Sequence, residues 1–316
     1  MTALKNKGLK PVTTLNKYLK SLGYSGGQIK SMLRSGKVWI KDAPTSYGGR
    51  SICEQDITIK SITPKMTVGR DPAIVYKTDQ LAVVWKPPGL LSVPARSRAR
   101  EHSLLSFVRI KLGVGEAVHR LDETCSGLML VALTTKSQEL LKKAIETRAI
   151  ERRYLALCNG HCPQSLEIES HLVRNRGDGL RGSWEHWHKN KPTAPSTPPE
   201  DSLYSKTYVH RRSLHDGFSL VEVKLDTGRT HQIRIHLSES GYPLLGDPLY
   251  APHGIKRKAP RTALHAYKLV FKDPFSSKNL SFEAPIADDL AMFMASINKP
   301  TEPLKDNKRK KRRKKR

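Results

Sequence analysis

The spacing of apolar residues near the N-terminus is helical. Leu15 and Leu19 fall on one face of a predicted short helix, and Ser25 with Gln28 forms a capping-box start for a second one. We expect the two helices to pack together through their apolar faces. The apolar stripe of the second helix consists of Ile29, Met32 and Leu33.

Strand-like segments follow these helices. Gly36 is expected to end the second helix, after which residues 37–42 (KVWIKD) are predicted to form a short strand, with residues 57–60 (ITIK) as its partner. Residues 1–60 therefore predict a small α/β module. Its basic residues either cover a solvated surface or follow a phosphate backbone, and their pattern alone favours neither. They include Lys17, Lys20, Lys30, Arg34, Lys37 and Lys41.

From residue 73 onward, strand-like and helical patterns alternate. Two β-like runs lie around Ile74 and at residues 81–85, before a Pro-Pro-Gly turn that ends strand pairing. A helix is predicted at 103–112, a strand at 128–133 and an amphipathic helix at 136–148. The apolar runs are short, as expected for a sheet covered by helices.

The second half of this region is richer in strands. Residues 152–160 (RRYLALCNG) and 218–225 (FSLVEVKL) are predicted strands, and the stretch from Thr227 turns into a helix that Gly241 ends. Strands outnumber helices, and their order favours antiparallel or mixed pairing over repeated βαβ units. We therefore predict an α+β domain built on a bent, mixed or antiparallel sheet.

Composition divides the chain into four segments. The α/β module of residues 1–60 precedes a linker at 61–72 that carries proline and glycine, and the large domain covers 73–297. Residues 298–316 form a basic tail, in which 308–316 are all lysine or arginine. Such a low-complexity run has nothing with which to build a core, so we expect it to be disordered.

The net charge of the chain indicates what kind of partner it binds. Lysine and arginine total 56 against 29 acidic residues, a formal charge of +27. A strongly basic balance indicates a polyanionic partner and does not indicate a particular fold. The apolar runs are too short to span a membrane, and the first residues lack the apolar core of a signal peptide. The four cysteines do not have the pattern of a small secreted disulfide framework, so we expect a cytoplasmic protein with reduced thiols. We also expect a monomer.

Two polar constellations stand where apolar elements begin. Asp122 follows His119 and Arg120 just before the 128–133 strand, which is either a turn with a surface ion pair or a site. A second group lies at the start of a predicted helix, where the helix dipole disfavours cations. An acid from elsewhere, such as Asp122, or an RNA phosphate would compensate for it. This second group consists of Arg229, His231, Arg234 and His236.

Four motifs in family order resemble the pseudouridine synthases of the RluA type. They are HRLDETCSGLMLVAL, RRYLALCNG, GRTHQIRIHLSESGYPLLGDPLY and LHAYKLVF, and WKPPGLLSVPAR resembles the strand and turn that precede the catalytic loop there. The resemblance spans about residues 73–286 and implies the fold of that family and isomerisation of specific uridines in structured RNA. Ribosomal RNA is the first expected substrate, and transfer RNA is the alternative. The first module similarly resembles the S4 RNA-binding domain, which precedes such catalytic domains in the family.

The resemblance assigns roles to four residues. Asp122 matches the nucleophilic aspartate, and Arg234 matches the arginine that pairs with it. Tyr154 matches the tyrosine that stacks on the target uracil and assists proton removal from C5, and Arg120 matches the arginine that fills the gap left by the flipped nucleotide. RNA contacts are also expected at His119, Arg229 and His231, and in the module at Lys30, Arg34 and Lys37. No cofactor is implied, because the isomerisation is redox-neutral.

The chain departs from the family pattern after the aspartate. Glu123 and Cys125 replace more usual residues there, and Arg152 stands where lysine is common, two residues before the tyrosine. We interpret the first two as affecting loop support or substrate choice, and the third as keeping the charge.

Two further segments leave alternatives open. Residues 174–202 are Pro/Gly-rich and polar with interleaved tryptophans, which favours a partly disordered surface loop over an RNA contact. The CNGHC segment suggests zinc, but its strand context and the resemblance favour no metal site. The candidate ligands would be Cys158, His161, Cys162, His186 and His188.

Two rival functions use the same sequence features. A catalytically silent RNA-binding or ribosome-assembly factor would retain the fold, but it would have no reason to retain Asp122, Tyr154 and Arg234 together. A nuclear or nucleolar basic adaptor is supported by the tail alone. The sequence does not decide which RNA or uridine is modified, or whether Asp122 attacks C6 of the base or C1′ of the sugar.

Overall fold

A computed structural model describes residues 13–21, 24–34, 38–40, 43–44, 51–52, 57–59, 69, 71–94, 102–191, 194–256 and 258–297. The first module contains two helices, a three-stranded sheet in the order β3-β2-β5 and a separate β1-β4 pair. Its elements are β1 (Thr13–Thr14), α1 (Leu15–Ser21), α2 (Gly26–Arg34), β2 (Val38–Ile40), β3 (Ala43–Pro44), β4 (Ser51–Ile52) and β5 (Ile57–Ile59).

The apolar faces of α1 and α2 pack together as the sequence predicts. Leu15, Leu19, Ile29 and Met32 are all buried in one small core with Leu33 and Val38. The predicted pairing of the two short strands is also confirmed, because β2 and β5 are antiparallel neighbours. Lys37 and Lys41 lie outside the described residues, as do Gly36 and the tail from residue 298.

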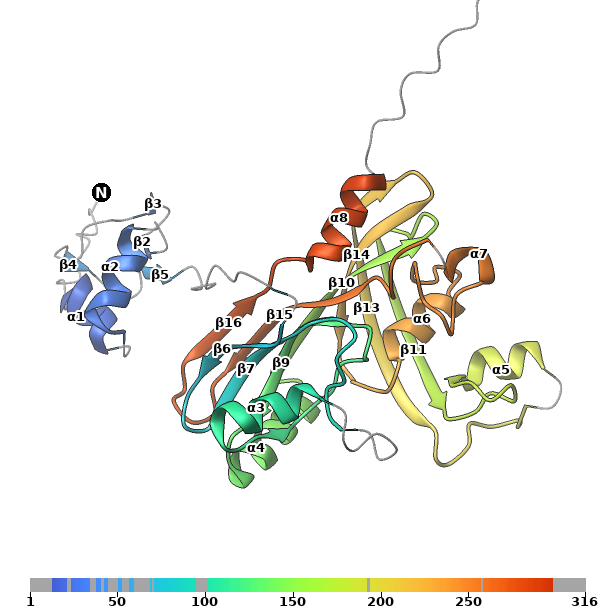
Figure 1. The fold of residues 1–316 in the computed structure, drawn as a ribbon, viewed down its shortest axis with the longest axis horizontal. Coiled ribbons are helices and arrows are strands. Elements are labelled where there is room, and N and C mark those ends of the chain that lie inside the picture. Colours follow the sequence, from blue (N-terminus) through green and yellow to red (C-terminus); the bar gives the residue numbers. More distant parts are fainter. Residues whose placement is uncertain are drawn as a thin grey trace, which may run out of the picture.

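The large domain is built on one curved mixed sheet (Figure 1). Its strand order is β12-β11-β13-β14-β10-β15-β9-β7-β6, with β16 beside β15 and β8 beside β9. The strands are β6 (Ala73–Lys77), β7 (Leu81–Lys86), β8 (Glu116–Ala117), β9 (Ser126–Ala132), β10 (Ile150–Asn159), β11 (Ser165–Val173), β12 (Gly182–Ser183), β13 (Leu203–His215), β14 (Phe218–Leu225), β15 (Leu264–Lys272) and β16 (Asn279–Glu283).

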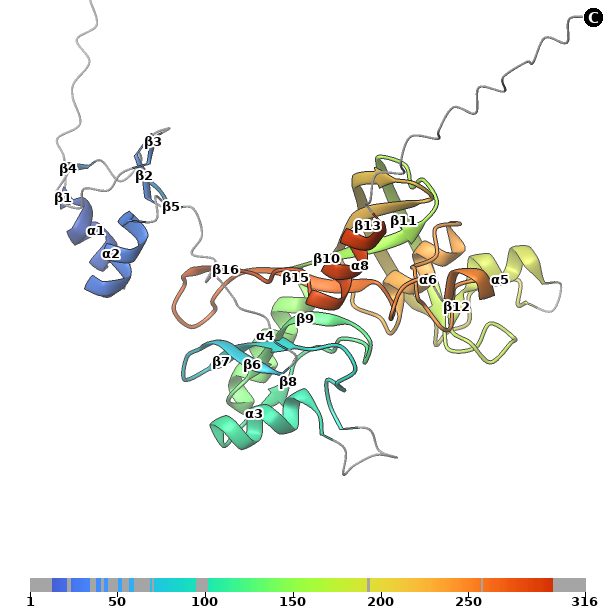
Figure 2. The same cartoon turned by 45° about the horizontal axis from the view of Figure 1, so that its top comes forward.

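Helices flank both halves of this sheet. In Figures 1 and 2, α3 and α4 lie beside the half that contains β6, β7 and β9, and α5 and α6 lie beside the half that contains β11 and β13. The helices are α3 (Leu104–Leu112), α4 (Thr135–Glu146), α5 (Trp184–Asn190), α6 (Gln232–Glu239), α7 (His253–Lys256) and α8 (Asp288–Ile297). None of the helices in the described ranges has the length and apolar character of a membrane span.

Strands β7 and β9 are buried on both faces, which explains their continuous apolar runs. Val84 and Met129 face a core that includes Tyr154 and the residues of α3, whereas Leu130 faces a second core with Leu141 of α4. Two of the predicted helices begin at a side-chain cap: the Ser103 hydroxyl accepts the N–H of Ser106 before α3, and the Thr134 hydroxyl accepts the N–H of Ser137 before α4. The α+β prediction is thus confirmed.

The two halves of the sheet meet where β9 runs parallel to β15. Ser126 and Gly127 pair there with His265 and Ala266, and the other neighbouring strands are antiparallel. Gly127 has φ +127°, and a Cβ at this position would lie 2.2 Å from the Ala266 carbonyl oxygen. Only glycine allows this approach of the two backbones, directly after the loop that carries Asp122.

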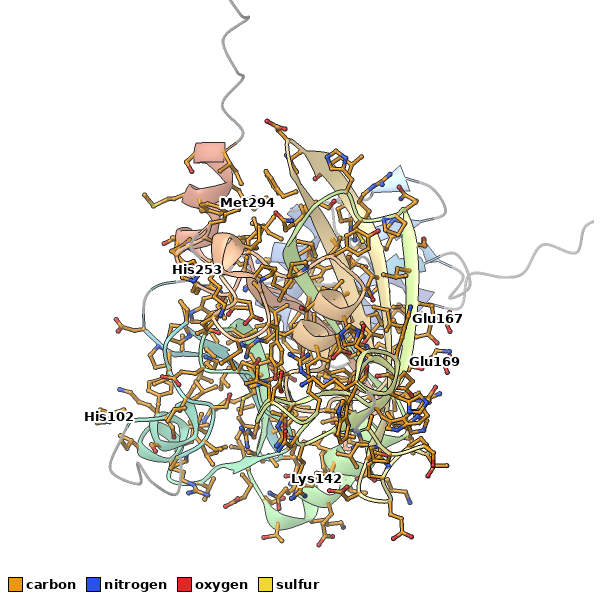
Figure 3. The ribbon with its side chains drawn as sticks, turned by 90° about the vertical axis from the view of Figure 1, so that its right-hand side faces the viewer. His102, Lys142, Glu167, Glu169, His253 and Met294 are labelled. Atoms are coloured by element: carbon orange, nitrogen blue, oxygen red, sulfur yellow. The ribbon has the colours of Figure 1, made fainter. Side chains whose placement is uncertain are left out.

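The prediction for residues 174–202 is wrong in part. This segment contains β12, which pairs with β11, and α5, whose N-cap is Ser183. The reason is capping: the Asn175 side chain accepts the N–H groups of Gly177 and Gly179, which orders a turn that looks unstructured in composition. Pattern reading also missed β11 and β13, whose outer faces are charged. Glu167 and Glu169 lie at the edge of the molecule on β11 (Figure 3), where both pair with Lys206.

Candidate active site

Asp122 lies on the loop between β8 and β9, which three side chains hold in place. The Ser92 hydroxyl donates to the Leu121 carbonyl and accepts the Leu121 N–H, at 2.7 and 3.0 Å. Arg261 donates to the Thr124 carbonyl at 3.0 Å. The third side chain is Lys86, at the end of β7.

Lys86 is fully buried and bonds to backbone oxygens of two loops. Its ammonium donates to the carbonyls of Pro87, Leu90 and Glu123 at 3.0, 2.6 and 2.9 Å. Burial lowers the pKa of Lys86 to about 8. It ties the Pro-Pro-Gly turn to the Asp122 loop, so the WKPPG segment that the sequence singled out has a structural role here.

The Asp122 carboxylate contacts two residues of the second constellation. Arg234 Nη1 lies 3.1 Å from Asp122 Oδ2, and His231 Nε2 lies 3.9 Å from Oδ1. The predicted pairing of Asp122 with Arg234 is therefore present, across 112 residues of sequence. Arg234 lies in the first turn of α6, near the positive end of the helix dipole. The negative charge of Asp122 therefore offsets the charge of Arg234 at this end.

A second acid, Asp247, fixes the orientation of Arg234. Its two carboxylate oxygens accept Nε and Nη2 of Arg234, both at 2.8 Å, and one oxygen also accepts the N–H groups of Leu249 and Tyr250. Burial opposes ionisation of Asp247, but its hydrogen bonds to Arg234 outweigh this and lower its pKa. The guanidinium is thus held from behind and presents only one edge to Asp122.

Tyr250 completes this support. Its hydroxyl lies 2.8 Å from His231 Nδ1, and its ring lies under the Arg234 guanidinium at 5.1 Å. His231 has φ +59° at the start of α6, a conformation that turns its ring toward Asp122. Burial and the charge of Arg234 lower the pKa of His231, against the opposing effect of Asp122.

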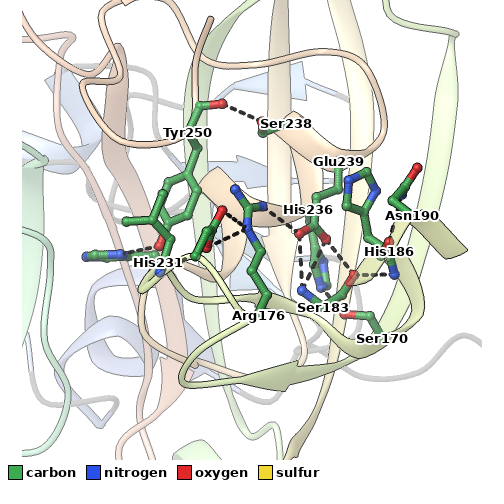
Figure 4. Close-up of polar contacts among 12 residues, drawn as sticks. Ser170, Arg176, Ser183, His186, Asn190, His231, His236, Ser238, Glu239 and Tyr250 are labelled. Carbon is green, nitrogen blue, oxygen red and sulfur yellow. Dashed lines mark hydrogen bonds and ion pairs between the residues drawn. The ribbon is translucent and has the colours of Figure 1, made fainter. Parts of the chain in front are cut away.

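The far end of α6 is anchored to the 174–202 segment (Figure 4). The Glu239 carboxylate accepts the Ser183 hydroxyl and N–H and pairs with Arg176. His236, one turn earlier, bonds to Ser170 and to Thr207. His236 is fully buried and does not line the cavity, so the structure gives it a packing role.

Tyr154 projects from β10 into a cavity of about 440 Å³ with Asp122 and Arg234. The pairing register of β10 with β15 shifts between Arg153 and Leu155, and such a bulge re-aims the intervening side chain. Burial raises the pKa of Tyr154 to about 12, although the charge of Arg152 acts in the opposite direction. The phenol is therefore protonated at neutral pH.

All the residues predicted from the catalytic motifs line this one cavity. Besides the three named above, the lining includes His119, Arg120, Arg229 and His231. Arg120 and Arg229 are exposed at its mouth, whereas His119 Nε2 accepts the Leu130 N–H. Lys30 is exposed on α2 and does not belong to this lining; the side chain of Arg34 lies outside the described residues, as does all of Lys37.

Sequence reasoning assigned no role to several residues that build the site. Asp247 and Tyr250 stood in the quoted GDPLY segment, and an acid directly after a glycine turn was the available signal. Lys86 could be recognised as a lysine inside an apolar strand. In the described part of the chain no three potential ligands cluster around a metal position, and Cys158 and Cys162 are both buried.

Comparison with known proteins agrees with the motifs. A family described as RNA pseudouridylate synthase matches residues 80–239. The chain is 33% identical to "Ribosomal large subunit pseudouridine synthase D" of Neisseria meningitidis, covering 87% of this chain and 75% of that protein. It is 35% identical to "Dual-specificity RNA pseudouridine synthase RluA" of Pasteurella multocida, over 68% of this chain and 93% of the other.

A solved human structure shares the fold. "Human RNA Pseudouridylate Synthase Domain Containing 1" superposes with a TM-score of 0.54 and 23% identity, covering 73% of this chain and 97% of that one. The family match, the two bacterial relatives and the shared fold agree with one another. The chain belongs to the RNA pseudouridylate synthase family.

Proposed function

We propose that this pseudouridine synthase modifies ribosomal RNA, with Asp122 as its nucleophile. The observation that carries the proposal is the Asp122–Arg234–Asp247 chain, in which a buried cation points one edge at a cavity carboxylate. The name of the Neisseria relative supports ribosomal RNA, and the name of the Pasteurella relative adds a second specificity.

The proposed reaction exchanges one glycosidic bond for another. The N1–C1′ bond of uridine breaks, a C5–C1′ bond forms, the C5 proton leaves and N1 gains a proton. The Asp122 carboxylate supplies a transient covalent bond, to C6 of the base or to C1′ of the sugar, and is released at the end. Atoms and electrons balance without an oxidant or a reductant.

The other cavity residues position the nucleotide in this proposal. Tyr154 provides an aromatic face for the flipped uracil, and Arg120 at the mouth fills the vacated space in the RNA. With its pKa raised to about 12, Tyr154 acts as a protonated phenol, which weighs against a standing role as base for the C5 proton. Arg229 and His231 are the next contacts to the RNA backbone.

The first module is proposed to bind structured RNA in the manner of an S4 domain. The two packed helices and exposed Lys30 support this role. Arg34 and Lys37 extend the same basic sequence. The cytoplasmic location, the monomeric state and the disordered tail stay predictions from the sequence.

Mapping of pseudouridines in total RNA tests the proposal. Cells with the gene, cells without it, and deleted cells carrying either wild type or Asp122→Asn would be compared. At least one ribosomal RNA position should lose pseudouridine on deletion and regain it only with wild type. Restoration by Asp122→Asn would remove the nucleophile assignment, and an unchanged map would favour the silent assembly factor.

A further inference from the structure

Arg152 is a buried cation in the cavity wall without a side-chain partner among the residues that the structure describes. Its side chain follows β10 on the same side as Tyr154, and the residue is 5% exposed. No hydrogen bond or ion pair joins its guanidinium to any residue that the structure describes, and Nε is fully buried without an acceptor. An unpaired buried charge is costly, so its retention calls for an explanation outside the protein.

His119, which also lines the cavity, carries a second buried donor without an acceptor among the described residues. Its Nε2 accepts the Leu130 N–H at 3.0 Å, so this nitrogen carries no proton and Nδ1 must carry it in the neutral ring. Burial and the charge of Arg152 keep the ring neutral by lowering its pKa to about 3. The Arg120 carbonyl lies near the ring but outside hydrogen-bond geometry, and Nδ1 is buried without an acceptor in the described part of the chain.

Gly228 gives the guanidinium its space. A Cβ at this position would lie 2.6 Å from Arg152 Nη1, and φ is outside the left-handed region. A side chain at this position would therefore displace the end of Arg152 from the place where it now lies against the backbone.

Three acids line the same cavity, and none of them forms an ion pair with Arg152. Asp122 pairs with Arg234, Asp226 pairs with Arg148 at 3.5 Å and lies 3.5 Å from the Tyr208 hydroxyl, and Glu146 is exposed at the end of α4. In contrast, the neighbouring Arg153 faces the other side of the strand and pairs with Glu151 and Glu222. The missing partner of Arg152 is thus an anion with several acceptor oxygens, and RNA supplies one such group per nucleotide as phosphate.

We propose that Arg152 and the Nδ1–H of His119 bind one backbone phosphate of the flipped-out nucleotide or its direct neighbour. Two residues of a strand span about 6.6 Å, so the phosphate would lie one step along β10 from the uracil platform of Tyr154. The assignment rests on the proposed function. Its role is to hold the nucleotide by its backbone while Asp122 reacts with the nucleoside.

The first test separates a ligand-binding arginine from a structural one. Arg152→Met should leave the Tm of the RNA-free protein unchanged within about 2 °C or raise it, because an unpaired buried cation is removed. Inorganic phosphate at constant ionic strength should raise the Tm of wild type more than that of Arg152→Met. Arg153→Gln is the matched control, since it neutralises the adjacent residue outside the cavity and should keep the phosphate response.

The second test identifies the phosphate, in an Asp122→Asn background so that turnover plays no part. The RNA is a transcript around the mapped uridine with single methylphosphonates, each removing one backbone charge. One substitution should weaken binding roughly 10- to 100-fold in the Asp122→Asn protein and have no further effect once Arg152→Met is added. Compared with Arg152→Met, Arg152→Lys should recover only part of the affinity, because an ammonium lacks the paired N–H donors of the planar guanidinium.

Three results would overturn the proposal. One is a large fall in Tm of Arg152→Met together with an unaltered phosphate response. Another is a methylphosphonate penalty that is the same with and without Arg152 at every position. A third is a scan of the Asp122→Asn protein without any sensitive phosphate near the target. A positive phosphate response with an unchanged pseudouridine map would instead retain the anion site and refute the proposed function.

Discussion

The two ends of the cavity differ in how far their polar groups are satisfied. At the Asp122 end, Arg234 is bonded on three nitrogens, to Asp247 and Asp122. At the Arg152 end, two buried donors on cavity-lining residues, Arg152 Nε and His119 Nδ1, have no acceptor in the described ranges. Both ends belong to the same domain and line the same cavity, so the contrast lies in how their polar groups are paired.

The contrast indicates what each end does before RNA arrives. Groups that stabilise a reacting centre are most effective when they are already oriented, and Arg234 is fixed by Asp247 and by Tyr250 below it. Hydrogen-bond donors that serve to recognise a ligand, in contrast, find their acceptors only when that ligand is bound. Under the two proposals above, Asp122 is therefore oriented before RNA arrives, whereas the nucleotide completes the opposite wall.

The largest expected effect is at the reacting carboxylate. Asp122→Asn should reduce single-turnover tritium release from 5-tritiated uridine RNA to below about a hundredth of wild type, because an amide cannot act as the nucleophile. RNA binding should remain, since the side chain keeps its shape and its contact to Arg234. Activity above that level would exclude Asp122 as the nucleophile. The Asp122 end of the cavity would then no longer be the reacting end in the comparison.

Next in size is the loss of a paired partner. Asp247→Ala leaves Arg234 buried with only Asp122, and should lower the free energy of unfolding by about 3–5 kcal/mol in urea titrations. Arg152→Met, which removes an unpaired cation, serves as the comparison and should show no such loss. Equal destabilisation by both variants would mean that the two ends do not differ.

Tyr154 lies between the two ends and should show an intermediate effect. Tyr154→Ala removes the stacking surface and should weaken RNA binding by roughly 1–3 kcal/mol. Tyr154→Phe keeps that surface, so binding should survive and any slowing in single-turnover assays reports the hydroxyl. A Phe variant as fast as wild type would assign stacking alone to this residue.

The smallest effect concerns pH. Burial lowers the pKa of His236 to about 4, compared with 6.5 for the free side chain, so the unfolded chain binds the extra proton first as the pH falls. The stability is intact above pH 6.5 and is lost between pH 6.5 and 4, by about 2 kcal/mol at pH 5. The difference in urea stability between wild type and His236→Gln should shrink over that window. A constant difference would show that this histidine is not held neutral by packing.

Elements whose apolar pattern is continuous could be predicted from the sequence. The strand at 218–225 coincides with β14, and the helix expected at 103–112 is α3 with its Ser103 cap. Strands β11 and β13 were missed because their outer faces carry charges that pair across the sheet, as Lys206 does with Glu169. That compensation depends on neighbours distant in sequence, and no local pattern contains it.

The site divides in the same way. Asp122 and Arg234 could be paired from motifs, because an acid and a misplaced helix-start cation each imply a partner. The importance of Arg152 could not, since what distinguishes it is the lack of an acceptor around it. The lack of an acceptor is a three-dimensional property, and the position of Arg152 two residues before the tyrosine does not reveal it.

The parallel contact between β9 and β15 has a consequence for the order of folding. Ser126 and His265 are bonded across 139 residues, and Gly127 meets Ala266 directly behind the Asp122 loop. Contacts of such separation form late, because a long loop must close before they contribute. During synthesis the Asp122 loop therefore lacks its contact with β15 until the residues of β15 have left the ribosome. A nascent or truncated chain that ends before β15 contains the whole HRLD motif but cannot form the site around it.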